Sequence, residues 1–124
     1  MKQIQVLTLE VDNKNKVIVP HVRFIDSDNV LSELYRIIGC DLVELVQVEV
    51  GGKFYDVYCD EEFLLKEKPV PTLFLSGEQV LCGNLVFTTC DEEGKLGGVK
   101  EEDIGKLIDF ILVQAVNLRI YLAK

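Results

Sequence analysis

The stretch LVELVQVEVGGKFYDVYC, residues 42–59, decides the local fold around which the rest of the chain can be arranged. Gly51 and Gly52 can both adopt the positive φ angles of a two-residue turn, and apolar residues alternate on either side of them. The sequence therefore predicts a β-hairpin with one apolar face and one largely wet face. The apolar face pairs Val50 with Lys53, Val48 with Tyr55 and Val46 with Val57, and the wet face pairs Glu49 with Phe54 and Gln47 with Asp56.

Two further strands precede this hairpin. Residues 2–11 and 17–25 are rich in Val, Ile and Leu, and the DNKNK segment at 12–16 has the composition of a loop. Pro20 lies inside the second run, and a proline cannot donate a hydrogen bond to a neighbouring strand. We therefore expect the second strand to be bulged or to lie at an edge of the sheet.

A short amphipathic helix links the two strand pairs. Residues 26–29 (DSDN) offer several N-caps, and apolar residues then recur at helical spacing from Val30 to Ile38 until Gly39 ends the pattern. After the hairpin, residues 60–77 contain Pro69 and Pro71 and are expected to form an irregular crossing. A strand at 79–89 follows, and Gly83-Asn84 interrupts it at a bulge or a close backbone approach.

The last segment, from about residue 100 to 122, is predicted to be helical, with acidic residues 101–103 in its first turn. It is apolar nearly all round from residue 107 on, and a domain of this size has little with which to cover both sides. We therefore expect self-association through residues 107–122, with deep burial within one chain as the alternative. The candidate interface residues are Phe110, Val113, Asn117, Ile120 and Tyr121.

These elements do not alternate as βαβ units, so the fold class is α+β. We expect a mainly antiparallel sheet of about five strands, with one short helix and one long C-terminal helix. The 124 residues, 48% of them hydrophobic, fit a single domain over residues 1–124 and exclude a disordered tail.

The charge and hydropathy patterns exclude several functions. Thirteen basic residues face 21 acidic ones, for a net charge of −8, and no stretch forms a basic stripe, so nucleic-acid binding is not expected. The first twenty residues lack the apolar core of a signal peptide, and no apolar run approaches the length of a membrane span. A cytoplasmic protein without membrane contact is the expectation.

Catalytic and metal-binding patterns are also missing. Cys40, Cys59, Cys82 and Cys90 form no close pair and sit in apolar surroundings, so we expect four small buried hydrophobes. His21 is the single histidine, and no nucleophile, phosphate-loop or dinucleotide motif accompanies it. We interpret the acidic triplets at 60–62 and 91–93 as solvated turns, and the triplet at 101–103 as the start of the last helix. The sequence therefore predicts no enzyme, no metal and no cofactor.

Four residues are candidates for a ligand site. An arginine and a glycine that permits close approach suit an anionic ligand, so a pocket could form at a subunit boundary from Gly83, Asn84, Asn117 and Arg119. The alternative is that Asn117 and Arg119 pair across an oligomer interface or extend to solvent.

Residues 31–107 resemble a group of small proteins of unknown function from phages and conjugative elements, chiefly of Gram-positive bacteria. The resemblance rests on three short motifs: Ile38-Gly39 leading into a strand, YCDEE at 58–62, and LCGN at 81–84 followed by DEEG at 91–94. Phe63 departs from the family pattern, which tends to have Gly there, and so does Pro71-Thr72.

The resemblance implies an accessory protein of a mobile element and names no activity. We expect a homo-oligomeric, non-enzymatic module that binds a host protein. The alternative is a protein that sequesters a small anionic molecule such as a nucleotide signal, in a pocket near the subunit interface.

Overall fold

The computed structural model describes residues 3–12, 17–62, 71–74, 80–90 and 96–111, and it is α+β as the sequence predicts. The main sheet is antiparallel, with the strand order β2-β1-β7-β4-β3 and β8 added beside β7; β5 and β6 form a second, two-stranded sheet. A helix over residues 101–111 completes the described chain. The labelled elements are β1 (Gln3–Asp12), β2 (Val17–Asp26), α1 (Val30–Ile38), β3 (Val43–Val50), β4 (Lys53–Asp60), β5 (Pro71–Phe74), β6 (Val80–Cys82), β7 (Leu85–Cys90) and β8 (Leu96–Gly97).

The predicted pairing of the hairpin is confirmed residue by residue, but the face expected to be largely wet buries Asp56. The strands β3 and β4 pair from Val50 with Lys53 to Val43 with Asp60, in the register that the alternation requires. Gly51 and Gly52 have φ angles of 60° and 83°, which only glycine adopts without strain. The edge position of Pro20 is confirmed as well, because β2 ends the strand order and pairs with β1 alone.

The segment between β4 and β7 corrects the sequence analysis. The expected irregular crossing contains a strand, β5, that pairs antiparallel with β6. The predicted strand at 79–89 is two strands, because Gly83, at a φ of 75°, breaks it between β6 and β7. The two halves then join different sheets, which explains the glycine at this point.

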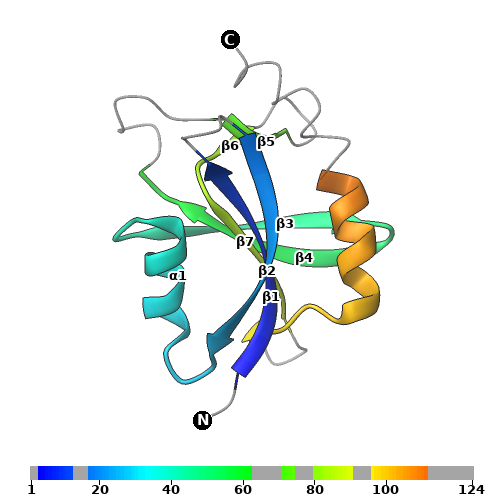
Figure 1. Ribbon diagram of the computed structural model, residues 1–124, viewed down its shortest axis with the longest axis horizontal. Coiled ribbons are helices and arrows are strands. Elements are labelled where there is room, and N and C mark those ends of the chain that lie inside the picture. The colour runs from blue at the N-terminus through cyan, green and yellow to red at the C-terminus, as the bar shows by residue number, and fades with distance from the viewer. Residues whose placement is uncertain (1–2, 13–16, 63–70, 75–79, 91–95, 112–124) are drawn as a thin grey trace.

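Two helices cover opposite faces of the main sheet (Figure 1). One face packs against α1, where Leu34, Ile37 and Ile38 are buried with Val6 and Val86 of the sheet. Asn29 makes no side-chain cap to this helix; instead the Asp26 carboxylate accepts hydrogen bonds from the N–H of Asp28 and the amide of Asn29. Gly39 ends the helix in the left-handed conformation, as predicted.

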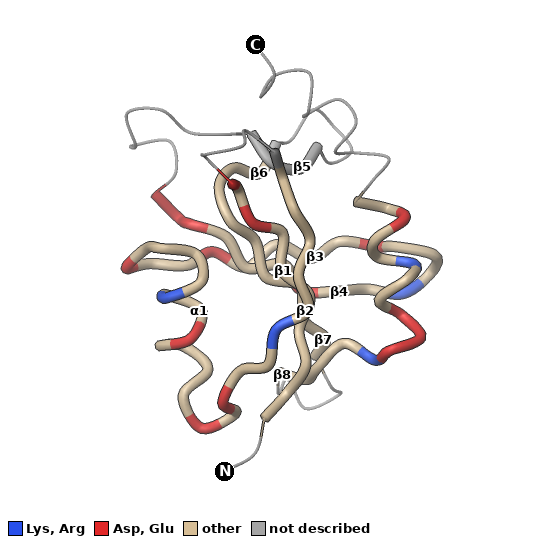
Figure 2. The backbone as a smooth tube through the Cα atoms, viewed as in Figure 1, with Lys and Arg blue, Asp and Glu red and all other residues tan. Residues whose placement is uncertain are grey.

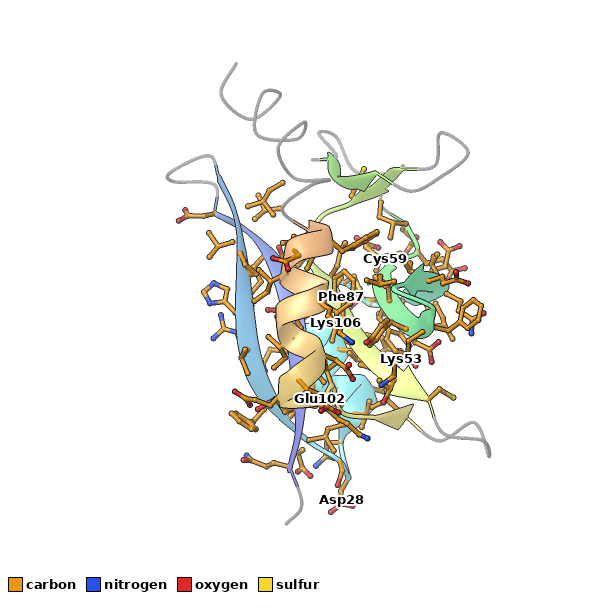
Figure 3. All side chains as sticks on the ribbon, turned by 90° about the vertical axis from the view of Figure 1, so that its right-hand side faces the viewer. Asp28, Lys53, Cys59, Phe87, Glu102 and Lys106 are labelled. Atoms are coloured by element: carbon orange, nitrogen blue, oxygen red, sulfur yellow. The ribbon has the colours of Figure 1, made fainter. Side chains whose placement is uncertain are left out.

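The helix at 101–111 covers the other face and the larger core. Leu107, fully buried, packs in the same cluster as Phe87 of β7, which is labelled in Figure 3. Lys53 at the hairpin turn binds Asp103 at the start of this helix, with 2.7 Å between Nζ and Oδ2. Phe110, one of the expected interface residues, is half-buried against this core, so part of its side chain stabilises the fold of the single chain. Neither α1 nor the helix at 101–111 is long and apolar enough to cross a membrane.

Candidate functional site

The strand β3 is an open edge of the sheet. It ends the strand order, pairs along its whole length with β4 and contains no proline. Hydrogen bonds alternate along an antiparallel pair, starting with the residues that flank the two-residue turn. Since Val50 and Lys53 flank it, Gln47 directs its N–H and C=O away from β4. Among the described residues no strand occupies that side. Such an edge is a template for pairing with another chain.

The opposite edge of the sheet is β2, which, unlike β3, is protected against pairing with a further strand. In β2, Pro20 supplies no N–H, so a neighbouring strand could not form a regular ladder there. Arg23 of the same strand binds the Glu10 carboxylate at both oxygens, with distances of 2.9 Å. Among the described strands, the sheet therefore has one blocked edge, β2, and one edge, β3, with no strand beside it.

Apolar side chains lie exposed beside the open edge. Leu45 of β3 is 51% exposed and Phe54 of β4 is 55% exposed. Both lie on the sheet face that carries α1, because Leu45 is directly opposite Tyr58, which packs against the α1 core. The helix packs against Val43 and Tyr58, and Asp56 is also buried, whereas Leu45, Gln47, Glu49 and Phe54 of the same face are exposed. We call Leu45 and Phe54 the hairpin shoulder.

An acidic pocket lies where the end of α1 and the segment just before β3 meet the end of β4. Figure 2 colours the acidic and basic positions along these segments of the backbone. The volume of the pocket is about 490 Å³. Asp60, opposite Val43 at the start of β3, is buried, and its carboxylate accepts a hydrogen bond of 2.9 Å from the N–H of Glu62. The expected solvated turn at 60–62 is therefore wrong for Asp60. The pocket is lined by Tyr35, Arg36, Gly39, Cys40, Asp41, Asp60 and Glu62.

The electrostatics of the pocket favour a cation. Three carboxylates line it against a single guanidinium, that of Arg36, which binds Glu33 at 3.2 Å. The C-terminal end of α1, at Gly39, adds the negative end of the helix dipole. Within the described part of the chain, no three acidic, histidine or cysteine side chains converge as metal ligands. The arrangement suits an organic cation such as an ammonium or guanidinium group.

A second cavity, of about 420 Å³, lies on β1 and β2 and is lined by Glu10, Val11, Asp12, Val19 and His21. Burial alone would raise the pKa of Glu10, but hydrogen bonds from Arg23 and Thr8 outweigh it and hold that pKa below its ordinary value. The Glu10 charge is therefore neutralised within the chain. This leaves the cavity with less to offer a charged ligand than the acidic pocket.

The cysteines are not all alike. Cys59 and Cys82 are buried as expected, and burial raises the pKa of Cys59 to about 12, so its thiol stays protonated. The expectation is wrong for Cys90, which is exposed at the end of β7, and Cys40 is half-buried in the wall of the acidic pocket. His21 lines the second cavity and Cys40 lines the acidic pocket, so the structure does not place this thiol and the single histidine in the same cavity.

The predicted ligand residues can be placed in part. The side-chain amide of Asn84 ties two elements together: its Oδ1 accepts the N–H of Val11 at 2.8 Å and its Nδ2 donates to the carbonyl of Ile37 at 2.9 Å. Gly83 turns the chain just before it. The remaining candidates for ligand and interface lie outside the described residues: Val113, Asn117, Arg119, Ile120 and Tyr121.

The hairpin surface was missed by the sequence analysis. Leu45 and Phe54 stand on the face expected to be wet, and this misplaced apolar pair was the available signal. The acidic pocket had no local signal, because its residues come from segments about 20 positions apart.

A family model described as "Domain of unknown function (DUF3846)" matches residues 4–111. No curated protein and no solved structure matches the chain.

Proposed function

The chain belongs to the DUF3846 family, whose function is unknown, and we propose that it is a non-enzymatic module that binds a partner protein along β3. The observation that carries the proposal is the unblocked edge of β3 beside exposed apolar side chains. The resemblance to small proteins of phages and conjugative elements suggests a host protein as the partner. An accessory role in a mobile element fits this mode of action.

The combination of edge and shoulder supports binding better than either feature alone. Exposed apolar residues are common on protein surfaces; Val22 and Phe24 are 45% and 57% exposed here, on the strand whose edge is blocked. An added strand would bond to the outward N–H and C=O groups of β3 and bury the exposed half of Leu45, which lies on the edge strand itself. That burial contributes about 1 kcal/mol. Backbone bonds supply affinity in such strand addition, and side-chain contacts supply specificity.

Site-specific photocrosslinking in the producing cells tests the proposal. A photoreactive phenylalanine analogue at position 54 should yield one adduct of defined mass. The same analogue at position 24 is the matched control, because Phe24 is equally exposed but lies beside Pro20.

A substitution in β3 then ties the adduct to the edge. Gln47→Pro removes an outward N–H and should abolish the adduct, whereas Gln47→Ala keeps that N–H and should preserve it. Circular dichroism checks that both variants fold. Equal adducts from positions 54 and 24, or an adduct that survives in folded Gln47→Pro, would refute the proposal.

A further inference from the structure

Asp56 of β4 is a buried carboxylate without a partner. Three aspartates of the described residues are buried, each less than a tenth exposed. Asp60 accepts the N–H of Glu62 at 2.9 Å, and Asp103 binds Nζ of Lys53 at 2.7 Å. Asp56 is 8% exposed, yet among the described residues no hydrogen bond or ion pair reaches its carboxylate. Buried polar groups are normally paired, because leaving one unpaired costs stability.

The Asp56 side chain points to the sheet face that carries α1. Asp56 is directly opposite Gln47 of β3 and Thr88 of β7, and Tyr58, two positions along β4, packs against α1 on the same face. Burial raises the pKa of Tyr58, and the nearby Asp56 charge raises it further. No fully buried side-chain oxygen of the described residues lacks a partner, so both carboxylate oxygens of Asp56 keep contact with solvent. A group from outside can therefore reach them.

We infer that this sheet face binds a partner protein through an arginine or lysine that pairs with Asp56, while neighbouring apolar groups of the partner contact the hairpin shoulder. A cationic donor forms strong hydrogen bonds with a carboxylate, and two open oxygens suit the fork of a guanidinium. Phe54, exposed two positions before Asp56, offers apolar surface to the stem of the basic side chain. Such contact does not require strand addition to β3, so the inference goes beyond the proposed function.

The setting of Asp56 favours a protein over a small molecule. Asp56 lines neither the acidic pocket nor the second cavity, and small ligands bind in cavities that enclose most of their surface. Charge argues against a second copy of this chain. The net charge is −8, and both described arginines already bind glutamates of their own chain, Arg23 to Glu10 and Arg36 to Glu33. The complementary occupant is a basic segment of another protein.

Thermal unfolding of two variants tests whether Asp56 serves a partner or the fold of the chain itself. Asp56→Asn removes a charge that no described residue pairs with, so the Tm of the free chain should stay unchanged or rise. The matched control is Asp103→Asn, which weakens the pairing of an equally buried aspartate with Lys53 and should lower Tm by about 4 °C. An equal fall of Tm for Asp56→Asn would give Asp56 a structural role and overturn the inference.

Selection of random peptides displayed on phage, with the full chain as bait, tests the contact itself. We expect enriched peptides in which Arg or Lys accompanies apolar residues, and their affinity for Asp56→Asn should fall about tenfold or more in fluorescence anisotropy. The control Asp28→Asn removes the same charge at an exposed site outside the hairpin, and should change affinity less than about twofold.

The variants of Gln47 separate this inference from the proposed function. Peptides that need Asp56 and still bind folded Gln47→Pro would support contact with the face independently of the edge. Peptides that lose binding to Gln47→Pro but bind Asp56→Asn as well as the parent chain would overturn the inference and leave the proposed function intact.

Two measurements on the free chain cover the other occupants. Sedimentation should show no association that Asp56→Asn abolishes, and a dimer of that kind would assign the face to a second copy. Native mass spectrometry of the chain purified from cells should show no bound amine that depends on Asp56. Either a dimer or a retained amine that disappears in Asp56→Asn would overturn the inference.

Discussion

Replacing Asn84 with alanine should destabilise the chain far more than its modest burial suggests. The Asn84 amide joins three elements: it precedes β7, accepts the N–H of Val11 in β1 and donates to the carbonyl of Ile37 in the last turn of α1. That carbonyl is one of the groups a helix end leaves without a partner inside the helix. The substitution therefore removes the side chain that satisfies two backbone groups at once.

The magnitude follows from those two hydrogen bonds. A buried polar group left without its partner costs about 1–3 kcal/mol, and both bonds here are partly buried, so the lower end applies to each. We expect Asn84→Ala to lower the free energy of unfolding by about 2 kcal/mol. For a chain of this length that corresponds to a fall in Tm of roughly 7 °C.

Urea unfolding followed by circular dichroism measures this loss, with an unchanged m value as the sign that only stability has altered. Gln47→Ala is the control, because it removes an exposed amide of the same chemistry, and its cost should stay below about 0.5 kcal/mol. Equal losses for Asn84→Ala and Gln47→Ala would refute the reasoning that Asn84 holds β1 and α1 together.

Three other predictions concern titration, thiols and assembly. The pKa of Glu10 is lower in the folded chain than its ordinary value, so Glu10 stabilises the fold above the ordinary carboxyl pKa and loses this effect as the pH falls through the folded pKa. Glu10→Gln should therefore reduce the fall of the urea unfolding midpoint between pH 6 and pH 3. A fall as steep as that of the unsubstituted chain would contradict this. Iodoacetamide at pH 8 should modify exposed Cys90 in the native chain and Cys59 only after unfolding, and mass spectrometry of the labelled peptides would detect the reverse order. If the chain self-associates through residues 107–122, Phe110→Asp should yield monomers in native mass spectrometry; an oligomer that persists in the folded variant would place the interface elsewhere.

Local agreement explains which elements could be predicted from the sequence. The hairpin of β3 and β4 was predicted in exact register because the Gly51-Gly52 turn and the alternation on both sides require the same pairing. The edge position of β2 could be predicted because Pro20 has no N–H with which to bond a second neighbouring strand. In both cases the deciding chemistry lies within a few residues of the element.

Non-local pairing explains what could not be predicted. The strand β5 exists because β6 pairs with it, and no pattern within the proline-containing segment signals that partner. The placement of β7 between β1 and β4 likewise depends on pairings across more than 70 and about 30 residues. Cys90 follows an apolar strand and was expected to be buried, yet it ends that strand at an exposed position.

The candidate site shows the same division. Phe54 was assigned by alternation to the correct face, but only the extent of α1 decides that Leu45 and Phe54 stay exposed there. The acidic pocket arises where the end of α1 meets the end of β4, and Asp41 and Asp60 meet only through the pairing of the hairpin. A surface built from separate segments in this way has no motif.

Hydrogen exchange at single backbone amides tests the central claim, the open edge of β3, most directly. In the free chain the N–H of Gln47 should exchange much faster than those of Val46 and Val48, which bond to β4. Addition of the partner captured by crosslinking at position 54 should slow the exchange of Gln47 to the rate of its neighbours. Protection of Gln47 in the free chain, or exchange that the bound partner leaves unchanged, would contradict strand addition at this edge.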